Sequence, residues 1–281
     1  MKKHKLTERM MKNYRHYLRS EEYAQGTIAK YVRDLNRFRE WLNGTDVTKE
    51  KTMDWKECLI QRGYSPSTVN AMLASIHNFF KFAGWEECRT RFLKIQRRIF
   101  REEKKELGKS EYEKLIETAK KKKQKRLAMI IETIGATGIR VSELKYLTVE
   151  AVKQGQAVVY LKGKIRTILF PGKLIQKLLV YAEMEQIKSG ELFITRNGKS
   201  VSRKQIWAEM KKLCREAGVV KTKVFPHNLR HLFARIFYQS SKDIVRLADV
   251  LGHSSIETTR TYLLTSGLEY QNWLDQLKLV V

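Results

Sequence analysis

The sequence predicts a mainly α-helical protein with one small β-hairpin, an α+β chain of two domains. Apolar residues recur at helical spacing along most of the 281 residues, and 3 Pro against 15 Gly favour long helices over sheets. Alternating side chains between Val158 and Phe170, interrupted by Gly163, predict the hairpin. The length suits two modest domains, each able to bury a core.

Residues 1–96 predict a bundle of four helices. The first helix has Met11, Tyr14 and Leu18 on one face, and the second runs from Ile28 to Asn43. A third spans Met53 to Ile60, and Pro66 opens a fourth that ends before Gly84. Basic residues lie between the apolar positions of these helices: Lys30, Arg33, Arg37 and Lys81. They fit a solvated surface or DNA contact, and only the net charge of +26 favours DNA contact.

Residues 97–109 are heavily charged and lack a clear period, which predicts a linker. Ser110 and Glu113 form a capping-box pattern that restarts helical structure. The basic run 120–126 fits either a phosphate-facing patch or a solvated turn. A buried helix then covers Leu127 to Ile134 and ends near Gly135 or Gly138.

Arg140 follows Gly138 at the expected start of a helix, where a guanidinium can hold phosphate oxygens. Glu143, three residues later, is placed to hold Arg140. The hairpin has Lys162 and Lys164 at its tip, and helices over 173–188 and 203–217 follow.

The last third of the chain concentrates the candidate site residues. If Pro226 opens a helix, His227, Arg230 and His231 share one face that suits phosphate binding. Gly252 ends the next apolar helix, and His253 follows it directly. Tyr262 comes nine residues later, on a segment begun by Ser254 or Ser255. Residues 270–277 predict an amphipathic C-terminal helix.

The charge is the main clue to a partner. A net charge of +26 and a pI near 10.0 favour a polyanion, with nucleic acid first and a membrane surface as the rival. The sequence lacks an apolar run of about 18 residues, and its basic start continues into polar sequence, so we expect a cytoplasmic protein without a membrane segment. Three scattered cysteines fit neither a disulfide framework nor a zinc site, and neither a metal nor a nucleotide cofactor is expected.

Three motifs occur together and in order: Thr137 to Leu144 (TGIRVSEL), His227 to His231 (HNLRH), and Leu251 to Ser255 (LGHSS) followed by Tyr262. With them the chain resembles the tyrosine recombinase (phage integrase) family over nearly its whole length. The resemblance implies an N-terminal helical core-binding, SAM-like domain (1–96), a linker (97–109) and a catalytic domain with a C-terminal tail (110–281) that clamp DNA.

The resemblance also implies the catalytic roles. Tyr262 is the nucleophile, and Arg140, His227, Arg230 and His253 bind the phosphate and handle protons. The hairpin lysine is Lys162, with Lys164 as the alternative because the turn is shorter than is usual in the family.

The expected chemistry has a physical basis. A phenol of pKa about 10 is a poor nucleophile at neutral pH, so it needs a base or nearby positive charge. His227 would accept its proton, Arg140 and Arg230 would neutralise the phosphorane, and Lys162 would protonate the leaving 5′ oxygen. The products, a 3′-phosphotyrosine and a free 5′-hydroxyl, allow a second strand to attack and exchange.

The expected function is therefore site-specific DNA recombination by a homotetramer on paired short core sites in double-stranded DNA. A type IB topoisomerase-like enzyme, which shares the chemistry, is the enzymatic alternative. A non-catalytic DNA-binding regulator would fit the basic charge equally well, but it would never form a covalent adduct with DNA.

Overall fold

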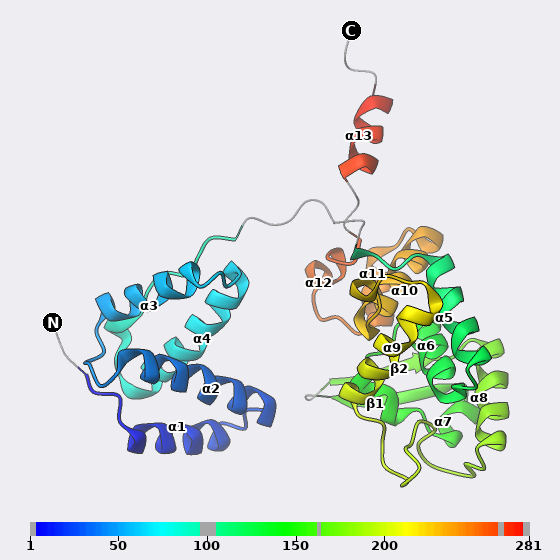
Figure 1. The fold of residues 1–281 in the computed structure, drawn as a ribbon, viewed down its shortest axis with the longest axis horizontal. Coiled ribbons are helices and arrows are strands. Elements are labelled where there is room, and N and C mark those ends of the chain that lie inside the picture. The colour runs from blue at the N-terminus through cyan, green and yellow to red at the C-terminus, as the bar shows by residue number, and fades with distance from the viewer. Residues whose placement is uncertain (1–3, 96–104, 162–163, 264–266, 278–281) are drawn as a thin grey trace. The chain divides into compact units, whose positions relative to one another are not determined.

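The computed structural model describes residues 4–95, 105–161, 164–263 and 267–277, and the chain divides into two compact units, Met1–Arg97 and Arg98–Val281 (Figure 1). Each unit has its own hydrophobic core. The fold is mainly helical with a two-stranded antiparallel sheet, which confirms the predicted fold class.

The first unit contains the four predicted helices and a short 3₁₀ turn: α1 (Glu8–Ser20), α2 (Gln25–Leu42), α3 (Lys49–Gln61), α4 (Pro66–Ala83) and η1 (Glu86–Cys88). Hydroxyl groups of Thr7, Thr48 and Ser65 accept hydrogen bonds from the first turns of α1, α3 and α4. Asn43 and Gly84 end α2 and α4 in the left-handed conformation.

One basic residue of this unit, Lys30, has a structural role that its sequence position did not indicate. The Lys30 ammonium donates to Asp34 Oδ2, to the Ala71 carbonyl and to Ser75 Oγ, each at 2.8 Å. Asp34 is buried, so Lys30 supplies its counter-ion and joins α2 to α4. Its ammonium therefore stabilises the pairing of these two helices within the unit.

The second unit begins with α5 (Lys109–Lys121), two residues earlier than predicted. Glu111, not Glu113, accepts the cap hydrogen bond, from Gly108 N–H at 2.8 Å. Glu111 also pairs with Lys223 at 2.9 Å, a contact that fixes which carboxylate caps the helix. Leu107, assigned by sequence to the linker, is buried in the second core.

The remaining elements are α6 (Lys125–Thr137), η3 (Val141–Tyr146), α7 (Val149–Lys153), β1 (Gln156–Leu161), β2 (Lys164–Leu169), α8 (Gly172–Met184), α9 (Arg203–Ala217), η4 (Lys221–Lys223), α10 (Pro226–Ser241), α11 (Ile244–Leu251), α12 (Ile256–Arg260) and α13 (Gly267–Gln276). Among the described residues, no helix is long and apolar enough to cross a membrane.

The hairpin strands pair in register, with Val159 opposite Arg166 and Tyr160 opposite Ile165. Directly opposed residues share a face, so Arg166 lies on the same face as the buried Val159 and Ile168. Tyr160 and Ile165, on the other face, are exposed.

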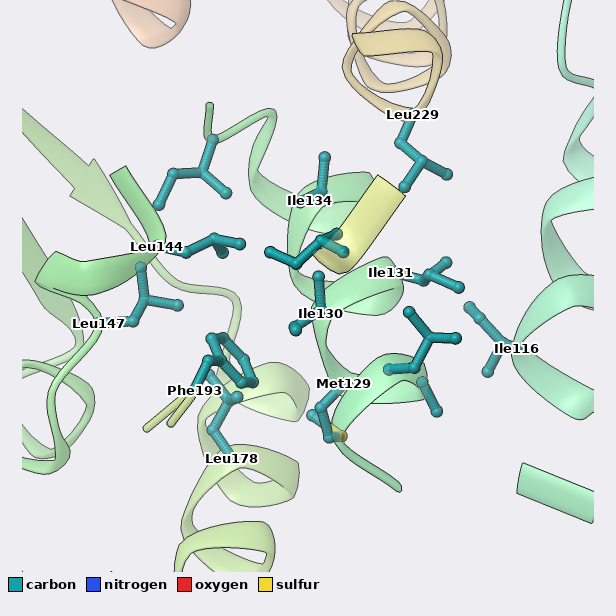
Figure 2. Packing of buried hydrophobic residues seen from close by; sticks show 14 of the residues in the cluster. Ile116, Met129, Ile130, Ile131, Ile134, Leu144, Leu147, Leu178, Phe193 and Leu229 are labelled. Atoms are coloured by element: carbon teal, nitrogen blue, oxygen red, sulfur yellow. The ribbon is translucent and has the colours of Figure 1, made fainter. Parts of the chain in front are cut away.

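α6 forms the middle of the second core. Figure 2 shows Ile130, Ile131 and Ile134 of α6 in the middle of the cluster, with Leu144 of η3 on one side and Ile116 of α5 on the other. A smaller cluster joins Ala234 of α10 to Leu247 and Leu251 of α11 and includes Tyr262. These two clusters hold α6, η3, α10 and α11 around the candidate site.

Candidate active site

Helix α10 begins at Pro226, as the sequence predicts, and its packing orients His227 and Arg230. Leu229 and Leu232 are buried in the second core, and His227 lies on the exposed edge of the helix. The Arg230 side chain is 2% exposed, which is rare for a charged group and requires partners.

Arg230 has these partners on two segments of the second unit, the end of α6 and the end of α11. It donates to the Gly138 carbonyl, to the Leu251 carbonyl at 2.7 Å and to His253 Nε2 at 3.0 Å. Burial and, second, the charge of Arg140 lower the pKa of Arg230 to about 10, with Tyr262 acting in the opposite direction. Arg230 is therefore protonated at neutral pH, a buried cation beside the tyrosine.

Arg140 lies at the end of α6, where Gly138 adopts φ +62°. A Cβ at Gly138 would lie 2.5 Å from the Phe233 ring, so only glycine allows this close approach to α10. Arg140 precedes a 3₁₀ helix rather than the expected α-helix. Glu143 accepts from Arg140 Nη1 at 2.9 Å and from its backbone N–H at 2.9 Å, which confirms that Glu143 holds Arg140.

His253 follows Gly252, the left-handed end of α11. Because a guanidinium can only donate, Arg230 fixes His253 Nε2 as an acceptor. The proton of the neutral ring then lies on Nδ1, which donates to Thr259 Oγ1 at 2.9 Å. Burial, followed by Arg230, Arg140, Arg166 and His227, lowers the pKa of His253 to about 4, so the ring is neutral at physiological pH.

Tyr262 follows α12 and is 5% exposed. Three imidazoles surround its ring, with centroid distances of 4.2 Å to His231, 5.4 Å to His253 and 5.5 Å to His227. Its backbone N–H donates to the carbonyl of Thr259, the residue whose hydroxyl binds His253. One buried threonine thus links the position of the tyrosine to that of His253.

Five of the six sequence-predicted site residues come together in this region: Arg140, His227, Arg230, His253 and Tyr262. The sixth, Lys162, lies outside the described residues, so its place in the site stays a prediction. Lys164, the alternative, begins β2. The chemistry of the region is that of an anion site, with two guanidinium groups beside a phenol.

The site lies in a cleft of about 1370 Å³, lined by residues of the second unit that include several that sequence reasoning did not single out. Arg166 lies on the inner face of the hairpin, and Arg203, Lys204 and Trp207 come from the start of α9. The alternation of the hairpin strand was the available signal for Arg166, since it places that residue on the buried side.

Comparison with known proteins agrees with this geometry. Residues 105–266 match the phage integrase family, and residues 11–87 match its N-terminal SAM-like domain. The tyrosine recombinase XerA of Pyrococcus furiosus is 30% identical over 99% of this chain and 99% of its own length. The chain belongs to the phage integrase family. It is thus a tyrosine recombinase, an enzyme of site-specific DNA breakage and rejoining.

Other relatives support the same assignment. Tyrosine recombinase XerD of Staphylococcus epidermidis is 30% identical over 95% of this chain and 97% of its length. A lambda integrase dimer bound to a COC′ core site has the same fold, with a TM-score of 0.74 and 18% identity over 92% of this chain and 95% of that one. These matches favour neither a topoisomerase nor a non-catalytic regulator.

Proposed function

We propose that this tyrosine recombinase cleaves double-stranded DNA at short core sites and exchanges strands through a 3′-phosphotyrosine at Tyr262. The observation that carries the proposal is the convergence of Arg140, Arg230 and His253 on one cleft beside that tyrosine. The cleft offers a phosphodiester two guanidinium groups held in fixed positions by protein carbonyls and Glu143.

Arg140 and Arg230 bind the non-bridging oxygens of the scissile phosphate. Their charges are worth most in the phosphorane, which carries more negative charge than the ground-state diester. Their carbonyl and carboxylate partners hold them in place before DNA arrives, so little reorganisation accompanies the reaction.

In the cleavage step, the Tyr262 oxygen forms a bond to phosphorus while the bond to the 5′ oxygen breaks. His227, whose ring lies 5.5 Å from that of Tyr262, accepts the phenol proton. Lys162 donates a proton to the leaving 5′ oxygen. His253 keeps its Nε2 on Arg230 in the free protein, so its first role is to fix the guanidinium that meets the phosphate.

The two units have separate roles in this proposal. Residues 1–96 form the core-binding domain, 97–109 the linker and 110–281 the catalytic domain, and the two domains clamp the duplex. The net charge of +26 supports extensive backbone contact with DNA. One solved relative is a lambda integrase tetramer bound to a Holliday junction, which supports a homotetramer on paired sites for this chain as well.

The test is to trap and sequence the covalent product. The protein is incubated with a library of duplexes nicked so that the short fragment on the 3′ side of the scissile phosphate diffuses away after cleavage. Adducts that survive denaturation are recovered. We expect DNA joined through its 3′ phosphate and a free 5′-hydroxyl on the released fragment, which polynucleotide kinase labels without prior phosphatase treatment. A 5′-linked adduct, or none on any duplex, would contradict the proposal.

A further inference from the structure

We propose that Arg166 is a positioning residue of the recombinase, which holds Glu143 and the end of α11 as one block so that Arg140, Arg230 and His253 form a single phosphate site. The inference rests on the proposed function, since it concerns the same cleft. The inference goes beyond the proposed function because it assigns a role to a residue outside the predicted catalytic set.

The first observation is where Arg166 lies. Its neighbours on the inner face of the hairpin, Val159 and Ile168, are 1% and 4% exposed, and the Arg166 side chain is 12% exposed. Burial lowers the pKa of Arg166, and Glu143 opposes that effect. Burying a guanidinium on an apolar strand face costs free energy unless the group has partners, so the contacts of Arg166 indicate its role.

The second observation is that these contacts join three elements. Arg166 Nη2 donates to Glu143 Oε2 at 2.6 Å, and Nη1 donates to the Val250 carbonyl at 3.1 Å. The guanidinium therefore connects β2, η3 and α11. Glu143 is 1% exposed, and its other oxygen accepts from Arg140 at 2.9 Å.

The third observation concerns the end of α11. Three successive carbonyls accept from three arginines: Val250 from Arg166 at 3.1 Å, Leu251 from Arg230 at 2.7 Å, and Gly252 from Arg140 at 3.5 Å. The last carbonyls of a helix lack partners within the helix and carry its negative end, so they suit guanidinium donors. One turn of backbone thus aligns all three arginines directly before His253.

Gly252 fits this arrangement by its size and its conformation. It has φ +63°, and a Cβ there would lie 2.4 Å from Arg166 Cδ. The space that a side chain would need is taken by Arg166, so the arginine lies directly against the turn that carries His253.

Charge explains why a second arginine on Glu143 matters. The three guanidinium groups and one carboxylate leave two positive charges facing the cleft. Without Arg166, Glu143 would neutralise Arg140 alone, and one net positive charge would remain. A phosphorane carries two negative charges and a phosphodiester one, so the loss falls mainly on cleavage and much less on DNA binding.

The test compares Arg166→Gln and Arg166→Lys with a matched control, Arg126→Gln. Arg126 also donates to one carboxylate (Glu209, 2.9 Å) and one carbonyl (Ile194, 2.9 Å) in the same unit, outside the cleft. Single-turnover adduct formation, DNA affinity, thermal unfolding and the NMR titration of His253 are measured on the full chain. The titration needs no DNA, so it decides the inference even if the proposed reaction fails.

We expect Arg166→Gln to form adduct on the order of 100-fold more slowly, because the cleft loses one of its two net positive charges, with DNA affinity within about threefold. Arg166→Lys, which keeps the charge, should recover part of the rate. The pKa of His253 should rise from about 4 in Arg166→Gln but not in Arg126→Gln.

Two results would overturn the inference: an unchanged His253 titration in Arg166→Gln, or adduct formation as fast as in Arg126→Gln. If Arg166→Gln does not fold, Arg166→Lys decides the matter, and a wild-type cleavage rate in that variant overturns the inference. A wild-type protein that forms no adduct at all contradicts the proposed function, and the His253 titration then still tests Arg166.

Discussion

Glu143→Gln is the substitution whose effect on stability the structure defines most closely. The Glu143 side chain is 1% exposed, and both of its oxygens accept hydrogen bonds. Oε1 accepts from Arg140 Nη1 at 2.9 Å, whereas Oε2 accepts from Arg166 Nη2 at 2.6 Å and from Arg140 N at 2.9 Å. Glutamine has nearly the same shape, but its amide nitrogen would face an N–H donor in either orientation.

The expected loss follows from these contacts. One charge-assisted hydrogen bond is worth about 1.5–3 kcal/mol, and Arg166, only 12% exposed, would keep its charge without a counter-ion. Removing one partner of a buried ion pair costs about 3–5 kcal/mol. Because Arg140 is 36% exposed, water can solvate its charge and limits the cost for that residue. We therefore expect the free energy of unfolding of the second unit to fall by about 3 kcal/mol.

The assay is urea unfolding followed by hydrogen exchange in α6, which reports on the second unit separately from the first. The matched control is Glu209→Gln, which removes a carboxylate that is 28% exposed and paired with Arg126, for an expected loss of about 1 kcal/mol or less. A Glu143→Gln protein within about 1 kcal/mol of wild type would refute the reasoning about the buried carboxylate.

Three further predictions concern pH, salt and the leaving group. Burial lowers the pKa values of His77 and His253 from 6.5 to about 4, so between these pH values the unfolded chain binds more protons than the folded chain. The free energy of unfolding should therefore fall as the pH drops from about 7 to 4. Denaturant titration at each pH should show a shallower decline in His77→Gln. DNA affinity should fall by about 10³-fold or more between 50 and 200 mM salt if at least six phosphates are contacted. An affinity that does not change with salt would count against the clamp. Lys162→Ala should cleave slowly on ordinary DNA but recover on a 5′-bridging phosphorothiolate, whose leaving group needs no acid, and recovery of Lys164→Ala instead would move the role to that residue.

Local patterns predicted the parts of the fold and site that depend on local structure. Pro226 opens α10 and Gly252 ends α11 as expected, because each residue fixes the backbone around itself. The family resemblance predicted the catalytic roles of Arg140, Arg230 and His253, and the fold brings these residues to one cleft.

What the sequence missed depends on contacts between distant segments. The cap of α5 forms at Glu111 because Lys223, far along the chain, pairs with the same carboxylate. Lys30 points into its own unit because Ala71 and Ser75 of another helix accept from it. Arg166 belongs to the site because strand pairing turns it inward against Glu143.

The identity of the nucleophile is the central claim, and Tyr262→Phe tests it most directly. The change removes one oxygen and keeps the ring that packs 4.2 Å from His231, so folding and DNA affinity should match wild type. Tyr238→Phe, a change of the same chemistry in the same small cluster, is the control. On a nicked substrate that traps cleaved ends, we expect wild type and Tyr238→Phe to form the covalent adduct and Tyr262→Phe to form none. An adduct that persists in Tyr262→Phe would contradict the account and assign the chemistry to another residue.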